Sequence, residues 1–319
     1  MNKLIQTLPK NSRILAAVSG GQDSMALLHA LAQFVPSHAA KVEVCHIDHG
    51  LRSDSSLDVQ CVASFATQLG IPLHGVTLEP FPPGENVEAY ARTLRYEHFQ
   101  RLLVERDLEW ICTAHTQDDA IETLFMRLVS GKDLRGILEK DERRRCLRPL
   151  LHTSRRTIEE YVAYHNIPFR EDSTNRDTTR LRNRVRHELI PFLENHFPGS
   201  QREVLARQVD LVGELIEVSD HLVQIILGEA RELEFGSREW AKSLRESLES
   251  SLPALHWRVM EELLFPYLKR RIGRAHALRV LDVLTHQTVG VELPGHWRFS
   301  RSGGSFSLVR GESREFSRS

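Results

Sequence analysis

Residues 13–34, RILAAVSGGQDSMALLHALAQF, join a short apolar strand to a helix through a loop with two adjacent glycines. Glycines let the backbone turn closely around an anion, and the free amides and dipole at a helix start favour negative charge. The loop Ser19–Ser24 therefore has the features of a phosphate-binding loop. It lacks the GKS or GKT of a Walker A loop and the GxGxxG spacing of dinucleotide-binding folds. A plain strand-to-helix turn, with Asp23 or Ser24 as the N-cap, is the alternative interpretation.

The aspartate in this loop points to a metal ion. A carboxylate would repel phosphate unless a divalent cation lies between them, so Asp23 is expected to contact Mg²⁺ at this phosphate-binding loop. The other residues expected to hold nucleotide phosphate are Ser19, Gly20, Gly21, Gln22 and Ser24.

Apolar strand patterns recur at intervals of about 30 residues along the first part of the chain, which is typical of βαβ units. The predicted strands are Arg13–Ser19, Lys41–Ile47, Leu73–Leu78 and Glu109–Thr113. The helical patterns between them cover Ser24–Phe34, Ser55–Leu69 and Asn86–Glu105. The pattern predicts an α/β fold with a parallel, doubly wound sheet, whose ligands bind at the carboxyl ends of the strands.

The chain changes character after Ser130. Residues Gly131–Arg186 are rich in arginine and show no strand period, although Thr153–His165 has a helical pattern. A turn at Phe197–Ser200 is interpreted as a domain boundary. We therefore expect a catalytic domain over residues 1–199, with an arginine-rich, RNA-facing segment at 131–199. The second domain, over residues 200–319, is expected to be mostly helical and to end in a β-hairpin around Gly303 and Gly304.

The composition is that of an ordinary globular protein. In 319 residues, 41% are hydrophobic and 27% charged, which excludes disordered, collagen-like and disulfide-stapled classes. The four cysteines are too widely spaced for a zinc knuckle or a CxxC pair. Neither a signal peptide nor a membrane-spanning run is found, so a cytoplasmic location is expected.

Charge is unevenly distributed along the chain. The formal net charge of −1 disfavours a nucleic-acid partner at first sight. Between Arg135 and Arg186, however, 14 basic residues face 8 acids, so this stretch carries +6 and the remainder carries −7. A basic stretch beside a nucleotide site would contact an RNA backbone. The alternative to RNA binding is that these cations form local ion pairs on solvated helices. A codon bias would explain why the basic residues of this chain are mostly arginine rather than lysine.

Polar residues follow the later strands. His115, Asp118, Asp119 and Glu122 are spaced to share one face of a helix beginning there, at the carboxyl end of a strand. Neighbouring carboxylates repel one another, which favours a shared cation or a bound ammonium group. An acidic first turn that complements the helix dipole is the alternative. His46 is either a nucleotide contact or a structural histidine.

Several motifs of this chain resemble those of one enzyme family, and they follow one another in the same order as in that family. After SGGQDS come HIDHGLR (46–52), NVEAYAR (86–92) followed by RY (95–96), TAHTQDDAIET (113–123), RPLL (148–151), DSTN (172–175), RN (182–183) and RH (186–187). SGGxDS is similar to the signature of the PP-loop ATP pyrophosphatases, which have a Rossmann-like sheet. The whole set resembles the tRNA(Ile)-lysidine synthetases of that superfamily.

The resemblance implies a ligase that uses ATP and Mg²⁺. Such an enzyme joins L-lysine to C2 of the wobble cytidine in the CAU anticodon of isoleucine tRNA, through an adenylated cytidine, and releases AMP and pyrophosphate. The implied catalytic residues are Asp23, His115, Asp118 and Asp119, and His46 and Arg92 are expected to contact the nucleotide. The implied substrate-binding residues are Arg95, Glu122, Arg148, Arg155, Asn175, Arg182, Asn183 and Arg186.

Other functions stay open from the residues alone. A tRNA thiolation enzyme would share SGGxDS but normally needs cysteines near the site, and Cys45 and Cys112 are expected to be buried. A non-catalytic RNA-binding module is the second alternative. The helical region after residue 200 offers either a tRNA-binding surface or a subunit contact in a homodimer.

Overall fold

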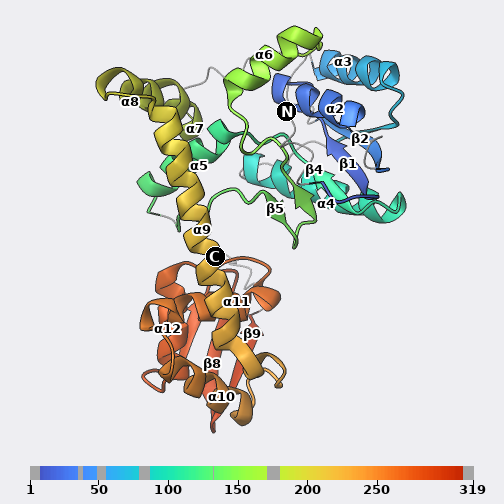
Figure 1. Cartoon of the computed structure of the whole chain (residues 1–319). Helices are drawn as coiled ribbons and strands as arrows, with labels where there is room; N and C mark the ends of the chain where they lie inside the picture. The colour runs from blue at the N-terminus through green and yellow to red at the C-terminus, as the bar shows by residue number, and fades with distance from the viewer. Residues whose placement is uncertain are drawn as a thin grey trace, which may run out of the picture. The chain divides into compact units, whose positions relative to one another are not determined.

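A six-stranded sheet forms the centre of the N-terminal part of the chain (Figure 1). The structure is a computed structural model that describes residues 8–34, 39–48, 55–78, 87–131, 133–170 and 180–311. The sheet order is β3-β2-β1-β4-β6-β5, and every neighbouring pair is parallel except β5 and β6. The strands are β1 (Arg13–Ala17), β2 (Lys41–Asp48), β3 (Leu73–Thr77), β4 (Trp110–Cys112), β5 (Lys140–Asp141) and β6 (Cys146–Leu147). The four predicted strands and the α/β class are confirmed.

Helices cover both faces of this sheet because its strands are apolar on both sides. Ile14 and Ala16 pack into one core with α2 and α3, whereas Leu15 faces a second core with Phe99 and Leu103 of α4. The sheet is thus doubly wound. The helices of this part are α2 (Gln22–Phe34), α3 (Ser55–Gln68), α4 (Val87–Glu105), α5 (Gln117–Val129), α6 (Arg155–His165), α7 (Leu181–Arg184) and α8 (Ile190–His196), with a π-helical turn at Val185–Leu189.

The strand order reverses between β1 and β4. From β1 the chain moves to β2 and β3 on one side, and it returns to place β4 on the other side. Ligands of open α/β sheets bind at such a reversal, beyond the carboxyl ends of the strands. The loop after β1 and the start of α5 after β4 both lie at this point of the sheet.

The chain divides into two compact units, residues 1–130 with 134–210, and residues 131–133 with 211–319. The division falls within the helix α9 (Gln201–Leu227), beyond the turn at Phe197–Ser200. The second unit continues with short 3₁₀ turns at Gly228–Arg231 and Pro253–Leu255, and with the helices α10 (Arg238–Glu249), α11 (His256–Leu268) and α12 (Arg274–Leu284).

A three-stranded antiparallel sheet completes the second unit. Its strands are β7 (Gly290–Leu293), β8 (Trp297–Ser302) and β9 (Ser305–Arg310). The predicted hairpin around Gly303 and Gly304 is present as β8 and β9, and β7 adds a strand that was not predicted. Gly236 lies so close to β9 that an added Cβ would be 2.0 Å from the Phe306 carbonyl oxygen, so only glycine fits there.

No helix in the described ranges is both long enough and apolar enough to cross a membrane.

Candidate active site

The loop Ser19–Ser24, called the glycine loop below, leaves the end of β1 and opens α2. Gly20 has a φ of +89°, a conformation that residues with a Cβ rarely adopt. The Ser24 hydroxyl donates to the Gly21 carbonyl at 2.8 Å and accepts from the Ser19 amide at 3.1 Å. These bonds hold the curve of the loop while the first amides of α2 lack acceptors within the helix. The loop can therefore receive an anion.

Asp23 is the acidic residue of this loop. Burial raises the pKa of its carboxyl group to about 6. The guanidinium groups of Arg155 and Arg186 act against this rise in pKa, and the carboxylates of Asp119 and Asp118 add to it. These four residues come from the segment after β4, from α6 and from the turn at Val185–Leu189, so sequence-distant charges converge on the glycine loop.

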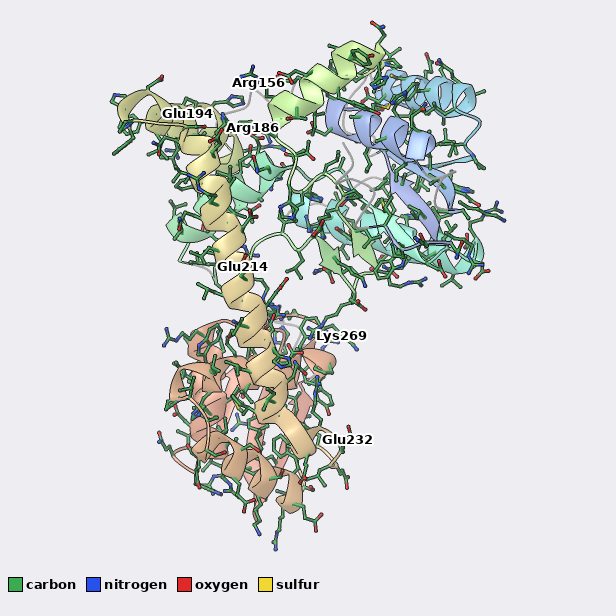
Figure 2. The ribbon with its side chains drawn as sticks, in the orientation of Figure 1. Arg156, Arg186, Glu194, Glu214, Glu232 and Lys269 are labelled. Carbon is green, nitrogen blue, oxygen red and sulfur yellow. The ribbon has the colours of Figure 1, made fainter. Side chains whose placement is uncertain are left out.

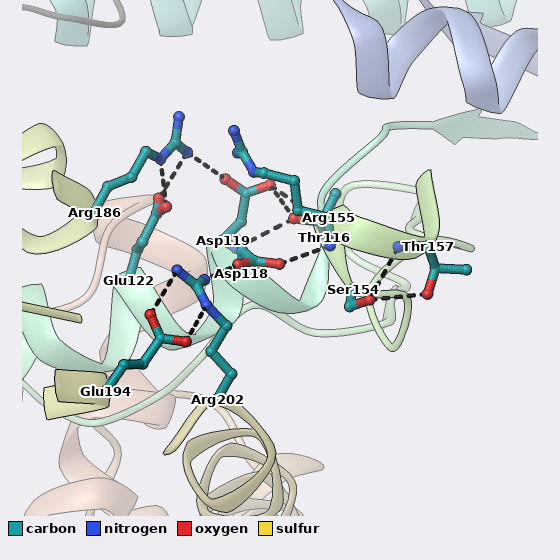
Figure 3. Close-up of polar contacts among 10 residues, drawn as sticks. All are labelled: Thr116, Asp118, Asp119, Glu122, Ser154, Arg155, Thr157, Arg186, Glu194 and Arg202. Carbon is teal, nitrogen blue, oxygen red and sulfur yellow. Dashed lines mark hydrogen bonds and ion pairs between the residues drawn. The ribbon is translucent and has the colours of Figure 1, made fainter. Parts of the chain in front are cut away.

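The start of α5 is fixed by a capping box. Thr116 is the N-cap, and its hydroxyl accepts from the Asp119 amide at 3.3 Å. The Asp119 carboxylate accepts in return from the Thr116 amide at 2.9 Å. The helix thus begins at Gln117, and His115 precedes it rather than sharing its face, which corrects the predicted helix start. Asp119 nevertheless keeps its other oxygen toward Arg186, at 3.6 Å (Figure 3).

Asp118 points in a different direction from Asp119. Only 4% of its surface is exposed. It accepts a hydrogen bond from the Arg155 amide at 2.8 Å and forms an ion pair with Arg202, on the first turn of α9 (Figure 3). Arg202 in turn donates to Glu194 at 2.8 Å. The Asp118 carboxylate is thus fully engaged in holding α5, α6 and α9 together.

Glu122 lies one turn further along α5 and is 1% exposed. Arg186 donates to both of its oxygens, at 2.6 and 3.0 Å, and the Arg182 guanidinium lies 3.4 Å away. Burial raises the pKa of Glu122, and the Arg186 hydrogen bonds oppose this effect. Because planar guanidinium and carboxylate groups match, this bidentate pair fixes Arg186 beside Asp119.

His115 lies between the strand and α5. Its Nδ1 shares a 2.9 Å hydrogen bond with the Thr113 hydroxyl. Burial lowers the pKa of His115 to about 4; Asp119 raises it, and Arg148, Arg182 and Arg92 lower it further. His115 is therefore a neutral imidazole at pH 7, able to hydrogen-bond but a weak base.

Comparisons with known proteins place this site in a family. The family model described as a PP-loop domain matches residues 1–193. The chain belongs to the PP-loop family. The tRNA(Ile)-lysidine synthase of a Nostoc species is 32% identical over 290 residues, which covers 86% of this chain and 84% of that protein. The tRNA(Ile)-lysidine synthase of Gloeobacter violaceus is 32% identical, with 91% of each chain covered.

A solved structure shares the fold at low sequence identity. It is the U34-tRNA thiolase NcsA from Methanococcus maripaludis with its [4Fe-4S] cluster, which is 15% identical. The TM-score is 0.55 over 67% of this chain and 78% of that one, so the likeness extends to the fold alone.

The other predicted nucleotide contacts of this PP-loop protein differ in position. His46 is buried, and its Nδ1 hydrogen-bonds to the Val18 carbonyl oxygen at 2.8 Å, directly before the glycine loop. Arg92 is exposed on α4, with its guanidinium 5.4 Å from the Tyr96 ring centre. Arg95 is half-buried on the same helix.

Four of the arginines predicted to bind substrate, Arg148, Arg155, Arg182 and Arg186, differ in their contacts. Arg148 is 5% exposed and donates to the Leu138 carbonyl at 2.5 Å. Arg182 and Arg186 lie against Glu122, as described above. Within the described ranges, Arg155 is the one of the four whose guanidinium forms no ion pair or carbonyl bond (Figure 3). Asn183 is buried, and Asn175 lies outside the described residues.

Two residues of the PP-loop site had not been anticipated. Glu194, labelled in Figure 2, belongs to α8, and Arg202 belongs to α9 after the intervening turn. Arg202 reaches Asp118, 84 positions earlier in the chain. No local pattern indicates such a contact. Thr116 was also missed, although Thr-x-x-Asp before an apolar run is a capping-box pattern.

A metal ion would have one protein ligand in the glycine loop. Within the described ranges, no group of three or more His, Cys, Asp or Glu side chains is arranged to hold a metal. Mg²⁺ is often held by one or two carboxylates together with substrate phosphates. Asp23 fits this arrangement. Burial disfavours the ionised form of its carboxyl group, and a bound cation would favour that form.

Proposed function

We propose that this chain is a tRNA(Ile)-lysidine synthase, which uses ATP to join L-lysine to the wobble cytidine of isoleucine tRNA. The observation that carries the proposal is the convergence of Asp23, Asp119 and Arg155 beside the glycine loop, at the reversal of strand order. Relatives of that name that match most of the chain support it. The reaction class is a ligation that forms a C–N bond.

The first step activates the base. The C2 carbonyl of cytosine has no leaving group, so its oxygen must first attack the α-phosphate of ATP while pyrophosphate leaves. We assign the amides of the glycine loop to holding the phosphates. We assign Arg155 to the charge that develops as pyrophosphate departs, because its guanidinium lowers the pKa of the nearby Asp23 and forms no ion pair with another described residue.

We propose Asp23 as the protein ligand of Mg²⁺ in this step. The ion would neutralise phosphate charge, which is the chemistry that such a cation supplies. Asp23 would hold the ion from the first turn of α2, where its carboxylate stands.

The second step joins the amine. The ε-amine of lysine attacks C2 of the adenylated cytidine, the C–O bond to AMP breaks, and the amine loses a proton. We assign Asp119 to binding the lysine ammonium, since one of its oxygens is held by Thr116 and the other faces the site. Glu122 holds Arg186 beside it. His115 is neutral and serves as a hydrogen-bonding group.

We propose that the RNA is also recognised by residues outside this site. A wobble base must leave the anticodon stack to be modified, as is usual in sequence-specific RNA recognition. We propose that Arg155 and the second unit contact the tRNA, and that the enzyme works in the cytoplasm.

The thiolation alternative has less support. Cys45, Cys112 and Cys146 are buried, and burial raises the pKa of each thiol, to about 12 for Cys45. Cys61 is half-buried on α3, and burial raises its thiol pKa too. A thiolation enzyme needs reactive thiolates, which these environments disfavour.

Release of AMP tests the proposal. The purified chain is incubated with ATP, Mg²⁺ and unmodified isoleucine tRNA, with and without lysine, and AMP is quantified. We expect multiple-turnover AMP release only when lysine and tRNA are both present, and none from Asp23→Asn. AMP release that does not depend on lysine would contradict the proposal.

A further inference from the structure

A cluster of cations lies where α11 joins α12 in the second unit. Between Glu262 and Asp282 the chain has five Lys or Arg residues and no acid. We call the four members of this cluster other than Arg271 the basic turn: Lys269, Arg270, Arg274 and Arg279. Lys269, labelled in Figure 2, caps the C-terminal end of α11 with a φ of +55°.

The described part of the chain supplies no carboxylate partner for these cations. All four are exposed, and within the described ranges none forms an ion pair with a carboxylate. The fifth cation, Arg271, differs because it donates to the buried Glu261 at 2.7 Å. The basic turn therefore presents uncompensated positive charge, although the chain outside 135–186 carries a net charge of −7.

The surface extends to a second turn of the same unit. A Cβ added at Gly295, between β7 and β8, would lie 3.3 Å from a terminal nitrogen of Arg270 and 3.6 Å from the Trp297 ring. On the other side, the Arg274 guanidinium lies 5.9 Å from the ring centre of the half-buried Trp257. Cations interleaved with aromatic rings are typical of RNA-binding surfaces.

Fold stability explains only part of this cluster. Lys269 and Arg270 complement the dipole at the end of α11, but Arg274 is the first residue of α12, where the dipole disfavours a cation. His276 lies among these charges, and burial, with Arg279 and Arg270, lowers its pKa. The cations repel one another in the free protein, so an anionic partner would relieve a cost that folding leaves in place.

The arginine-rich stretch at 135–186 offers fewer available cations to RNA than its composition indicates. Its guanidinium groups are largely engaged within the protein. Examples are Arg144 with Asp141, Arg145 with the carbonyls of Leu108 and Glu109, and Arg170 with Asp58. Cations already bonded to protein acceptors release fewer counterions on binding RNA.

We infer that the basic turn binds backbone phosphates of the tRNA substrate. This inference rests on the proposed function, since tRNA is the polyanion that the reaction supplies. It favours RNA over a second copy of the chain as the occupant, because the patch is cationic and the two faces of a symmetric dimer would repel there.

The test compares two matched double variants. Arg270→Gln/Arg279→Gln removes two unpaired cations of the basic turn. Lys242→Gln/Arg298→Gln removes two exposed cations of the same unit that have acid partners, Glu246 and Glu292. The dissociation constant for tRNA is measured between 50 and 300 mM salt, and thermal unfolding checks that both variants fold.

We expect the first variant to weaken tRNA binding about tenfold and to reduce the slope of log Kd against log salt by about two, roughly one for each lost phosphate contact. The control should keep the wild-type slope. Equal slopes for the basic-turn variant and the wild type would overturn the inference, as would a variant that alters self-association in sedimentation but leaves tRNA binding unchanged.

The outcome is separable from the proposed function. If the wild type forms no lysidine but its tRNA affinity depends on the basic turn, the proposed function fails and the RNA surface stands. If the wild type forms lysidine while the variant keeps the wild-type affinity, slope and KM for tRNA, the inference fails alone.

Discussion

Asp23 opposes folding through its raised pKa, and we propose that the same residue holds Mg²⁺ in the reaction. Its pKa of about 6 in the fold, against a usual 3.8, means that ionisation is harder in the folded than in the unfolded chain. Above pH 6 the charged carboxylate therefore costs at most about 3 kcal/mol of stability, and the cost disappears as the pH falls to 3.8. We predict that Asp23→Asn raises the free energy of unfolding by about 1–3 kcal/mol at pH 7.5 in metal-free buffer. Urea unfolding at pH 7.5 and 3.8 checks this; a variant less stable than the wild type at pH 7.5 would be the opposite result.

Asp118 and Asp119 are adjacent in the chain and have different surroundings. The sequence predicts acids at the start of a helix, but their separate directions depend on Arg202 and on the capping box, which only the fold reveals. We predict that Asp119→Asn raises the lysine KM at least tenfold, the effect of about 1.5 kcal/mol or more from a lost charged hydrogen bond, while single-turnover pyrophosphate release persists. Asp118→Asn should instead lower stability by about 1–3 kcal/mol with a smaller change in lysine KM. Steady-state kinetics and urea unfolding of both variants measure this; the reverse ranking of lysine KM would assign the ammonium to Asp118.

The α5 cap couples an element boundary to the chemistry. Thr116→Ala should cost about 1 kcal/mol in stability and reduce lysidine formation severalfold, because the Thr116 hydroxyl also bonds to Asp119. Ser237→Ala is the matched control, since Ser237 caps α10 in the second unit by accepting from the Trp240 amide at 3.0 Å. It should lose similar stability and retain activity, and Thr116→Ser should restore both. Thermal unfolding and initial rates for the three variants decide the matter, and equal activity of the two alanine variants would refute the coupling.

Elements with strong periodicity were predictable, and those without it were not. The four predicted strands and the helices between them follow from apolar spacing. Strands β5 and β6 have two residues each, too few for any alternation, and they form only because Cys146 and Leu147 pair with β4. The predicted start of α5, at His115, lies two residues before the observed start at Gln117. The spacing of the acidic residues carries no information about the Thr116 cap.

At the scale of the whole molecule, charge averaged along the chain misleads in both directions. The net charge of −1 gives no sign of the basic stretch at 135–186. The positive charge of that stretch in turn gives no sign that its arginines bond to protein groups. Which cations stay unpaired depends on contacts such as Arg186 with Glu122, 64 residues apart. The sequence therefore gives the number of charged residues in a stretch, whereas the fold determines which of them bond to other protein groups.

The central claim is that the chain attaches lysine to a cytidine of isoleucine tRNA. The most direct measurement is mass spectrometry of the nucleosides of that tRNA after reaction with ATP and lysine labelled with ¹⁵N at the ε-amine. We expect one cytidine to gain the mass of a lysine residue, joined through the labelled nitrogen. An unmodified cytidine, or a base that has exchanged oxygen for sulfur, would contradict it.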